Sequence, residues 1–316
     1  DVDVKLSEVA AATCSVARGL RTSTKASPTQ RAADVTKVSI SISRDLPSYQ
    51  HYRVYAIPGP TKLFPDQESV VLFLKDLTEI SKAQKFRTDF VANVSHELRT
   101  PLMSIKGAVE TIQGPAKNDE PAKQKFLDIM DSQTSRMENL INDLLILSRI
   151  ELEEHIRPSN KISLEKIFNK LKDIHITNIE KNNIDLNINI DKHFDKIIGN
   201  EDRMLTVFSN LIDNSIKYSE KNKSIKVLTS KSVGKLVKPG VKISIIDEGI
   251  GIPQNQIVRI TERFYRVDIE KSKKVGGTGL GLAIMKHIVT QHRGEFEIKS
   301  QLGKGTEFNI HIPSEL

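Results

Sequence analysis

Two stretches of regularly spaced apolar residues constrain the fold of this chain most. In both, apolar side chains recur every three or four positions, the spacing of one face of a long helix. The first stripe is Phe86, Phe90, Val94, Leu98, Leu102, Ile105 and Val109, and the second is Phe126, Ile129 or Met130, Met137, Leu140 or Ile141, Leu144 and Leu147. Because one hairpin cannot cover both stripes, we expect an antiparallel helical hairpin that closes as a four-helix-bundle dimer.

The regions on either side of the hairpin have other patterns. Before it, alternating residues predict three strands at 38–42, 52–57 and 69–75 in an antiparallel meander, one face of a small domain. Residues 6–20 favour a helix, and 21–31 a loop. After the hairpin, helices and strands alternate, which predicts an α/β sandwich. We expect helices at 164–172, 201–218 and 278–291, and strands at 183–190, 224–230, 241–246, 294–300 and 305–312. The overall fold class is therefore multidomain α+β.

Composition excludes several classes of function. The chain has 316 residues, a net charge of +7 and a single cysteine, Cys14. One cysteine excludes an internal disulfide and a cysteine-rich metal site. The lysines are dispersed, so the charge predicts no nucleic-acid site. Apolar runs are far shorter than a membrane span of about 20 residues. Because the chain begins with Asp1 rather than Met, we interpret it as a fragment, with any membrane segment lying upstream.

His96 lies beside the apolar stripe of the first helix, in the string S-H-E-L-R-T-P-L at residues 95–102. Neutral imidazole can attack an electrophilic phosphorus atom. The neighbouring Glu97 carboxylate would accept the Nδ1 proton, and Thr100, one turn later, could orient a water molecule. Pro101 is expected to kink the helix where a second domain approaches. A lone helical histidine is otherwise usually a surface residue.

The string around His96 resembles the H-box of sensor histidine kinases, and four later segments resemble the Bergerat-type ATP site of the same family. The first of these, N-L-I-D-N-S-I-K-Y at residues 210–218, resembles the N-box. Asn210, Asn214, Lys217 and Tyr218 would lie along one helix, an arrangement that an asparagine-rich surface helix could also show. By resemblance, Asn214 would ligate Mg²⁺, which prefers oxygen ligands, and Lys217 would meet phosphate.

The other three segments resemble the G1, F and G2 boxes. In D-E-G-I-G-I-P at residues 247–253, Asp247 would accept a hydrogen bond from the adenine amino group, while Gly249 and Gly251 let the backbone approach the base. R-F-Y-R-V-D at 263–268 lies in an expected lid over residues 254–274, in which Arg266 could reach the γ-phosphate. The family usually has Phe where Thr261 stands, which weakens an apolar anchor of this lid.

The G2-like string G-G-T-G-L-G-L at residues 276–282 opens an expected helix, so that its amides and the helix dipole favour phosphate. It is not a Walker motif, because no Gly-Lys-Ser/Thr follows. The expected nucleotide contacts in it are Gly277, Thr278, Gly279, Leu280 and Gly281.

The resemblance covers residues 77–316 and is strongest to phosphate-regulon sensor kinases (PhoR-type) of alphaproteobacteria. It implies a partial PAS-like sensory region at 1–76, a dimerisation and phosphotransfer domain at 77–153 and a catalytic ATP-binding domain at 154–316. It also implies autophosphorylation of His96 with ATP and Mg²⁺, then transfer to an aspartate of a response regulator, and dephosphorylation of that partner. The expected location is the cytoplasmic portion of an inner-membrane sensor. The alternatives are another ATPase or a serine kinase of this fold, and a non-catalytic scaffold.

Overall fold

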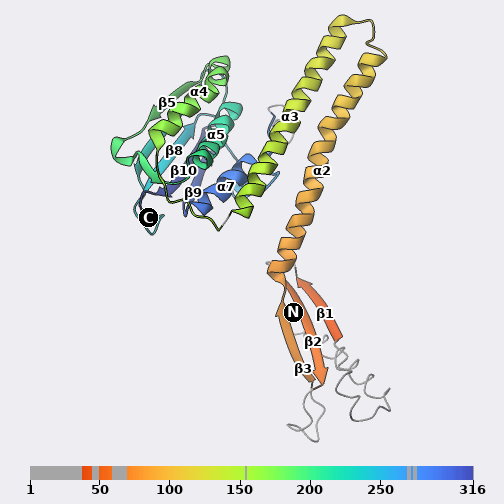
Figure 1. Ribbon diagram of the computed structural model, residues 1–316, viewed down its shortest axis with the longest axis vertical. Coiled ribbons are helices and arrows are strands. Elements are labelled where there is room, and N and C mark those ends of the chain that lie inside the picture. The colour runs from red at the N-terminus through yellow and green to blue at the C-terminus, as the bar shows by residue number, and fades with distance from the viewer. Residues whose placement is uncertain are drawn as a thin grey trace, which may run out of the picture. The chain divides into compact units, whose positions relative to one another are not determined.

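A computed structural model describes residues 38–44, 50–58, 70–153, 155–268, 272 and 276–315 of the protein (Figure 1). The chain forms two compact units, residues 1–94 and 95–316. The helix expected at 6–20 and the loop at 21–31 lie outside the described residues.

The first unit contains a three-stranded sheet. Its strands are β1 (Val38–Arg44), β2 (Gln50–Pro58) and β3 (Val70–Asp76), all antiparallel and in sequential order. The register pairs Ile40 with Val54, and Val54 with Leu74. The predicted meander is therefore confirmed. The next helix begins directly after β3. The backbone amide of its first residue, Thr78, donates a hydrogen bond to the Asp76 carboxylate at 2.8 Å.

Two long helices, α2 (Thr78–Gln113) and α3 (Glu120–Leu152), form the predicted hairpin. The helix α2 continues through Pro101 without interruption. A short turn joins the helices, with Ala116 buried inside it. Asp119 caps α3, since its side chain accepts a hydrogen bond from Ala122 N at 3.0 Å.

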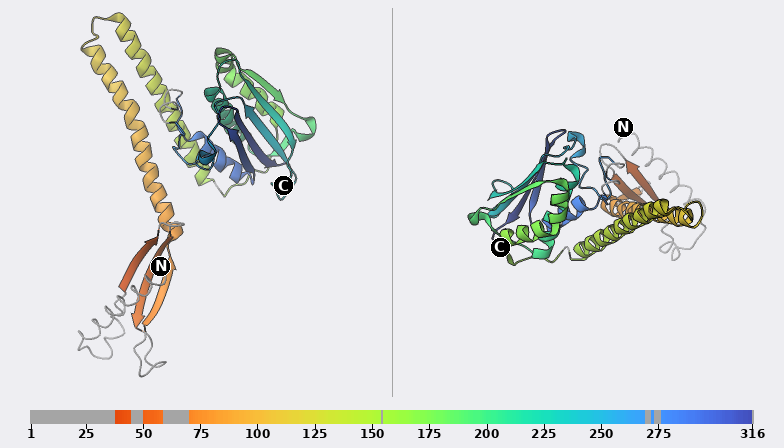
Figure 2. Two further views of the ribbon diagram at one scale, coloured as in Figure 1. Left: turned by 180° about the vertical axis from the view of Figure 1, so that it is seen from behind. Right: turned by 90° about the horizontal axis from the view of Figure 1, so that it is seen from above.

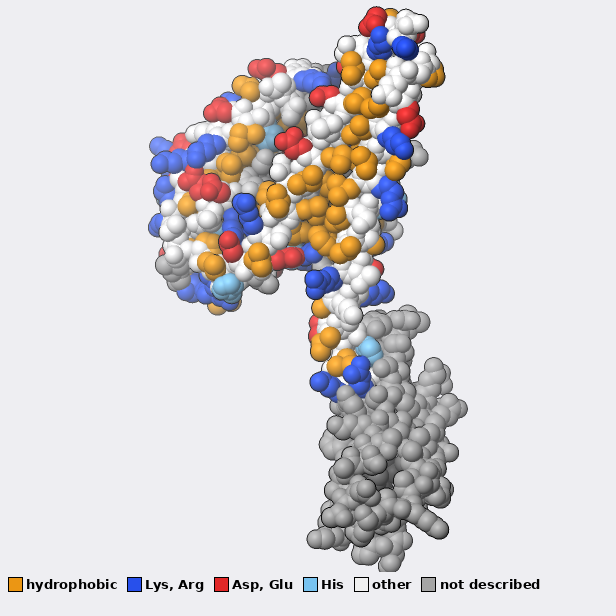
Figure 3. Space-filling view, turned by 45° about the vertical axis from the view of Figure 1, so that its right-hand side comes forward, with side chains coloured by type: hydrophobic (Ala, Val, Ile, Leu, Met, Phe, Trp, Pro, Cys, Tyr) orange, Lys and Arg blue, Asp and Glu red, His pale blue; other side chains and the backbone are white. Residues whose placement is uncertain are grey.

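Several apolar side chains of the hairpin stay on the surface. The space-filling view shows hydrophobic side chains gathered along the hairpin helices (Figure 3). The exposed residues include Leu102, Met103, Leu127, Ile141 and Leu145, each at least 45% exposed. Leu102 and Ile141 belong to the predicted stripes, whereas Met103, Leu127 and Leu145 are apolar residues outside them.

The C-terminal part of the second unit is built on a five-stranded sheet of order β5-β7-β8-β10-β9. The strands are β5 (Asp185–Asn189), β7 (Ser224–Lys231), β8 (Gly240–Asp247), β9 (Glu295–Gln301) and β10 (Gly305–Pro313). Only β5 and β7 pair in parallel. The central strands β8 and β10 are almost wholly buried, and each has neighbouring strands on both edges.

Three helices cover one face of this sheet: α4 (Leu164–Asn182), α5 (Glu201–Tyr218) and α7 (Gly281–Gln291) (Figure 2). The core between the layers is mainly aliphatic, with one aromatic pair, Phe168 and Phe208, whose ring centroids lie 4.9 Å apart. The two layers confirm the predicted α/β sandwich.

Four details differ from the sequence prediction. The helix expected to end at residue 172 continues to Asn182 and stops at Asn183, which adopts a left-handed φ of 51°. The helix α7 begins three residues later than expected because the glycine-rich turn extends to residue 280. Two short paired strands, β4 (Lys161–Ser163) and β6 (Lys196–Ile198), were not predicted, since three residues are too few to show alternation.

A buried histidine joins the end of α7 to the start of α5. His292 Nδ1 donates to the Ile288 carbonyl at 2.7 Å, and Nε2 accepts from Asn200 N at 3.0 Å. Both contacts require the neutral ring with the proton on Nδ1. Burial lowers the pKa of His292 from 6.5 to about 4.

This pKa gives the protein a pH-dependent stability. Between pH 6.5 and about 4 the unfolded chain binds a proton at His292 that the folded chain does not, so stability falls as the pH is lowered through this window. The full effect is about 3 kcal/mol. Urea unfolding at several pH values should show this loss in the wild type and a flatter profile in His292→Gln. The exposed control His155→Gln should retain the wild-type slope; an equally steep profile in His292→Gln would contradict the assignment.

Candidate nucleotide and phosphoacceptor sites

The predicted phosphoacceptor, His96, lies on the surface of α2. Its side chain is exposed, and so is that of Thr100 one turn later. The Thr100 hydroxyl donates to the His96 carbonyl at 3.3 Å. An exposed imidazole can be approached by a ligand held on another domain, which the predicted chemistry requires.

Glu97, beside His96, is held by two arginines. Arg136 of α3 donates from Nη2 to Glu97 Oε2 at 3.1 Å. Arg266, from the expected lid segment at 254–274, donates to the same oxygen at 2.9 Å and to Oε1 at 3.4 Å. The side chains of Glu97, Arg136 and Arg266 are 16%, 11% and 5% exposed, so these ion pairs are only weakly screened by solvent.

Asp247, the predicted adenine contact, is a buried carboxylate at the end of β8. Its Oδ1 accepts from Gly249 N at 2.9 Å and from Thr306 N at 3.0 Å, and its Oδ2 accepts from the Ser215 hydroxyl at 3.2 Å. Burial raises the pKa of Asp247, and the hydrogen bonds oppose that shift. A carboxylate has about four acceptor positions, so Oδ2 can still accept a hydrogen bond from a ligand amino group.

The two glycines after Asp247 are required by close backbone approaches. A Cβ on Gly249 would lie 2.8 Å from the Tyr218 carbonyl oxygen. Gly251 has a φ of +71°, and a Cβ there would lie 2.1 Å from the carbonyl oxygen of Gln301. These contacts bring the turn against the end of α5 and the β9–β10 hairpin.

The predicted N-box residues lie on α5. Asn210, Asn214, Lys217 and Tyr218 are all half-buried. Asn210 Nδ2 donates to the Gly281 carbonyl at 3.4 Å, which joins α5 to the first residue of α7. Lys217 forms an ion pair with Asp213 at 2.6 Å. Within the described part of the chain, Asn214 makes no side-chain hydrogen bond, so its amide oxygen can ligate Mg²⁺ together with phosphate oxygens.

The glycine-rich turn before α7 contacts the lid segment. Gly279 has a φ of +75°, and a Cβ there would lie 2.9 Å from the backbone of Phe264, whose amide donates to the Gly279 carbonyl at 2.8 Å. Gly277 N donates to the Ser272 carbonyl at 2.9 Å. Leu280 is fully buried and anchors the start of α7.

The described residues of the lid segment make further contacts with neighbouring elements. Tyr218 and Ser272 share a hydrogen bond between their hydroxyl groups at 2.9 Å. Thr261, where the family usually has Phe, is buried. Arg266 donates to the Thr278 carbonyl at 2.9 Å as well as to Glu97. The four predicted segments therefore converge on one region, as their order and spacing in the sequence suggested.

Two hairpin residues that the sequence did not single out, Asp143 and Glu151, contact this region, and a third, Arg136, contacts Glu97 within the hairpin. Thr278 donates to Asp143 Oδ2 of α3 at 2.6 Å, and burial raises the pKa of Asp143. Glu151 near the end of α3 pairs with Arg263, and Arg136 pairs with Glu97. Their sequence neighbourhood is that of an ordinary helix, so only the fold reveals these contacts.

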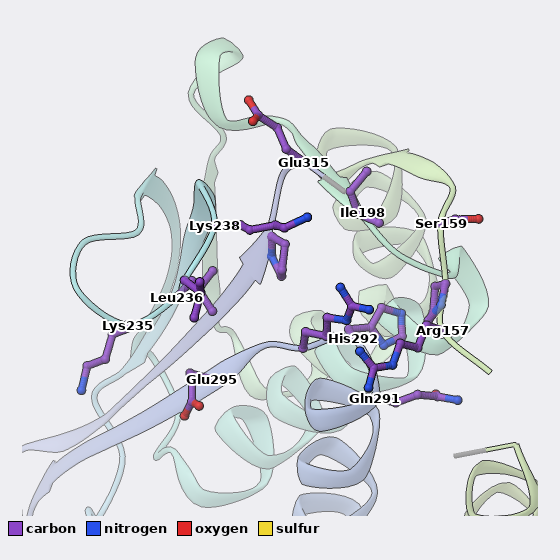
Figure 4. A pocket seen from close by; sticks show the side chains of 14 residues that line it. Arg157, Ser159, Ile198, Lys235, Leu236, Lys238, Gln291, His292, Glu295 and Glu315 are labelled. Atoms are coloured by element: carbon purple, nitrogen blue, oxygen red, sulfur yellow. The ribbon is translucent and has the colours of Figure 1, made fainter. Parts of the chain in front are cut away.

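A separate cavity of about 550 Å³ lies at the other end of α7 (Figure 4). It is lined by the linker residues Arg157–Ser159, by the loop between β7 and β8, and by Gln291 and His292. Since α7 has 11 residues, its two ends are about 16 Å apart. This cavity is distinct from the region that gathers the predicted nucleotide residues.

Two family models match this chain. The family of histidine kinase-, DNA gyrase B- and HSP90-like ATPases matches residues 199–316, and the His Kinase A phospho-acceptor domain matches residues 86–153. The phosphate regulon sensor protein PhoR of Pseudomonas aeruginosa is 35% identical over 252 residues, covering 79% of this chain and 55% of the relative. The sensor protein kinase WalK of Staphylococcus aureus is 37% identical over 246 residues, covering 78% and 58%. The chain thus spans about half the length of these curated relatives.

Solved structures share the fold. The histidine kinase AdeS of Acinetobacter baumannii superposes with a TM-score of 0.53 at 24% identity, covering 70% of this chain and 98% of AdeS. The histidine kinase ThkA, in a complex with the response regulator protein TrrA, gives a TM-score of 0.57 at 21% identity, covering 88% of this chain and 79% of that one. These similarities confirm the helical hairpin joined to an α/β domain.

The geometry of Asp247 leads to a binding prediction. Asp247→Asn should weaken binding of Mg²⁺–ATP about 100-fold, because an amide in this position presents a donor to the adenine amino group and to neighbouring donors. Isothermal titration calorimetry measures the affinity. The matched control is Glu248→Gln, the same chemical change at the next, exposed position, which should leave affinity within about twofold of the wild type. Equal affinities for both variants would contradict the assignment of Asp247.

Proposed function

Because this chain belongs to the histidine kinases that join a His Kinase A phospho-acceptor domain to a histidine kinase-type ATPase domain, we propose that it phosphorylates itself on His96 with ATP. One observation carries this proposal: a single compact unit contains both an exposed imidazole and a region of the nucleotide-binding type. The imidazole is next to Glu97, whose carboxylate is held by arginine, and the second region is centred on Asp247. The proposed domains are a PAS-like region at 1–76, the phosphoacceptor hairpin at 77–153 and the ATP-binding domain at 154–316.

The proposed reaction moves the γ-phosphoryl group of ATP to Nε2 of His96. The bond from the β–γ bridging oxygen to the γ-phosphorus breaks, ADP leaves, and the N–P bond forms. Glu97 accepts a hydrogen bond from Nδ1–H, so that Nε2 carries the nucleophilic lone pair. Mg²⁺ on Asn214 would neutralise phosphate charge, and the amides of the glycine-rich turn would hold the phosphates at the start of α7. Catalysis is mainly positioning and charge neutralisation.

The proposed second step passes the phosphoryl group to an aspartate on a response regulator. Support comes from the fold shared with ThkA, whose structure was solved with the response regulator protein TrrA. The exposed Thr100, one turn after His96, would place a water molecule for dephosphorylation of the partner. A role in phosphate-dependent signalling is proposed from the 35% identity to PhoR.

The proposed assembly is a homodimer through the hairpin. Its exposed apolar side chains gather along the two helices, and a contiguous apolar surface of this kind marks an interaction site (Figure 3). Within the described residues, none of the helices has the length and apolar character needed to cross a bilayer. We propose that the chain is the cytoplasmic part of a membrane sensor.

The first test of this function is labelling with γ-³²P-ATP. The wild type should incorporate acid-labile, base-stable label, as expected for phosphohistidine, and His96→Gln should incorporate less than about 1% of it. The control His193→Gln changes another exposed histidine and should label normally. Undiminished label in His96→Gln, or acid-stable label on serine, would favour a different kinase of this fold, and failure to bind ATP would favour a scaffold.

The second test concerns the dimer. Leu127→Glu with Leu145→Glu places two charges on the apolar face of the hairpin and should shift the protein from dimer to monomer. Sedimentation equilibrium measures the mass. Ile174→Glu introduces the same change at an exposed apolar position of α4 and should remain dimeric. A monomeric wild type at micromolar concentration would refute the proposed assembly.

A further inference from the structure

The two arginines on Glu97 come from different parts of the compact unit. Glu97 lies on α2 and Arg136 on α3, 39 residues apart, and the hairpin itself brings them together. Arg266 belongs to the lid segment, 169 residues from Glu97. The Arg136 contact is therefore internal to the hairpin, whereas the Arg266 contact exists only while the C-terminal domain rests against it.

The two arginines also differ in how they use the carboxylate. Arg136 donates to Oε2 alone, at 3.1 Å. Arg266 contacts both oxygens, with Nη2 at 2.9 Å from Oε2 and Nη1 at 3.4 Å from Oε1. If Arg266 leaves, Oε1 is available to another donor while Oε2 stays fixed by Arg136. In the proposed reaction that donor is the Nδ1–H of His96, the adjacent residue in the sequence.

We propose that Arg136 is a positioning residue for autophosphorylation, which holds Glu97 in place for His96 when Arg266 moves from Glu97 to the nucleotide. This inference rests on the proposed function and adds a residue to it. An arginine suits this role because its planar guanidinium fixes the direction of a carboxylate, whereas a lysine ammonium acts as a point charge. Arg136 is only 11% exposed and Glu97 only 16%, which limits screening of this ion pair by solvent.

The inference predicts a specific kinetic pattern. Arg136→Gln should lower kcat for autophosphorylation about 10- to 100-fold, because a misplaced Glu97 no longer orients the imidazole. The KM for ATP should stay within about twofold of the wild type, since Arg136 does not contact the proposed nucleotide region. Arg136→Lys should restore part of the rate. Lys125→Gln removes one exposed positive charge from the same helix and should match the wild type.

A double-mutant cycle separates positioning from a structural role. If Arg136 acts through Glu97, then adding Arg136→Gln to Glu97→Gln should cause no further loss of rate. If Arg136→Gln instead damages the fold, the rate should fall in the Glu97→Gln background as well, and the thermal midpoint should drop. An unchanged rate in Arg136→Gln, or losses that multiply in the double variant, would overturn this inference.

The same experiment distinguishes failure of this inference from failure of the proposed function. A wild type that incorporates no label on His96 would reject both. A wild type that labels His96 and is unaffected by Arg136→Gln would leave the histidine kinase assignment intact and remove only the role of Arg136.

Discussion

The nucleotide-type region depends on one buried carboxylate, that of Asp247. Burying a charge is costly unless hydrogen bonds replace the lost water. Ser215, Gly249 and Thr306 supply three such bonds from α5, from the turn after β8 and from β10. Because these donors belong to three separate elements, the carboxylate can be buried only when all three are assembled. The remaining acceptor position on Oδ2 is therefore presented to a ligand only when the whole domain is folded.

Most of this architecture could be predicted from the sequence, because it rests on periodic patterns. The spacing of the apolar residues gave both hairpin helices, and the limits of α5 agree with the structure at residues 201 and 218. The positions of Asp247, Gly249 and Gly251 were predictable because a tight turn after a buried strand requires particular residues. Gly251 illustrates this, since its φ of +71° and its approach to Gln301 leave no room for a side chain.

What the sequence could not predict were contacts between distant segments. Asp143 and Arg136 lie on an ordinary helix, and their partners Thr278 and Glu97 are 135 and 39 residues away. Arg266 was expected at a phosphate group, whereas in this structure it pairs with Glu97. Such side-chain pairings depend on how helices and domains pack in three dimensions, and the local spacing of apolar residues does not determine them. The longer course of α4 and the strands β4 and β6 escaped prediction for the related reason that their ends are set by tertiary packing and capping.

The proposed mechanism requires the hairpin and the C-terminal domain to move relative to one another, and the chemistry of their contacts is compatible with this. The side-chain contacts described between them are ion pairs and hydrogen bonds, such as Arg266 with Glu97 and Thr278 with Asp143. Polar contacts of this kind can be exchanged for equivalent contacts with charged ligand groups, so relative motion of the two parts is expected when a ligand binds. Arg266 and Thr278 are also the groups expected to contact phosphate. A nucleotide would therefore compete with the hairpin carboxylates for the same donors, and binding it would favour release of the docked arrangement. Glu97 would still have one partner after that release, because Arg136 belongs to its own hairpin.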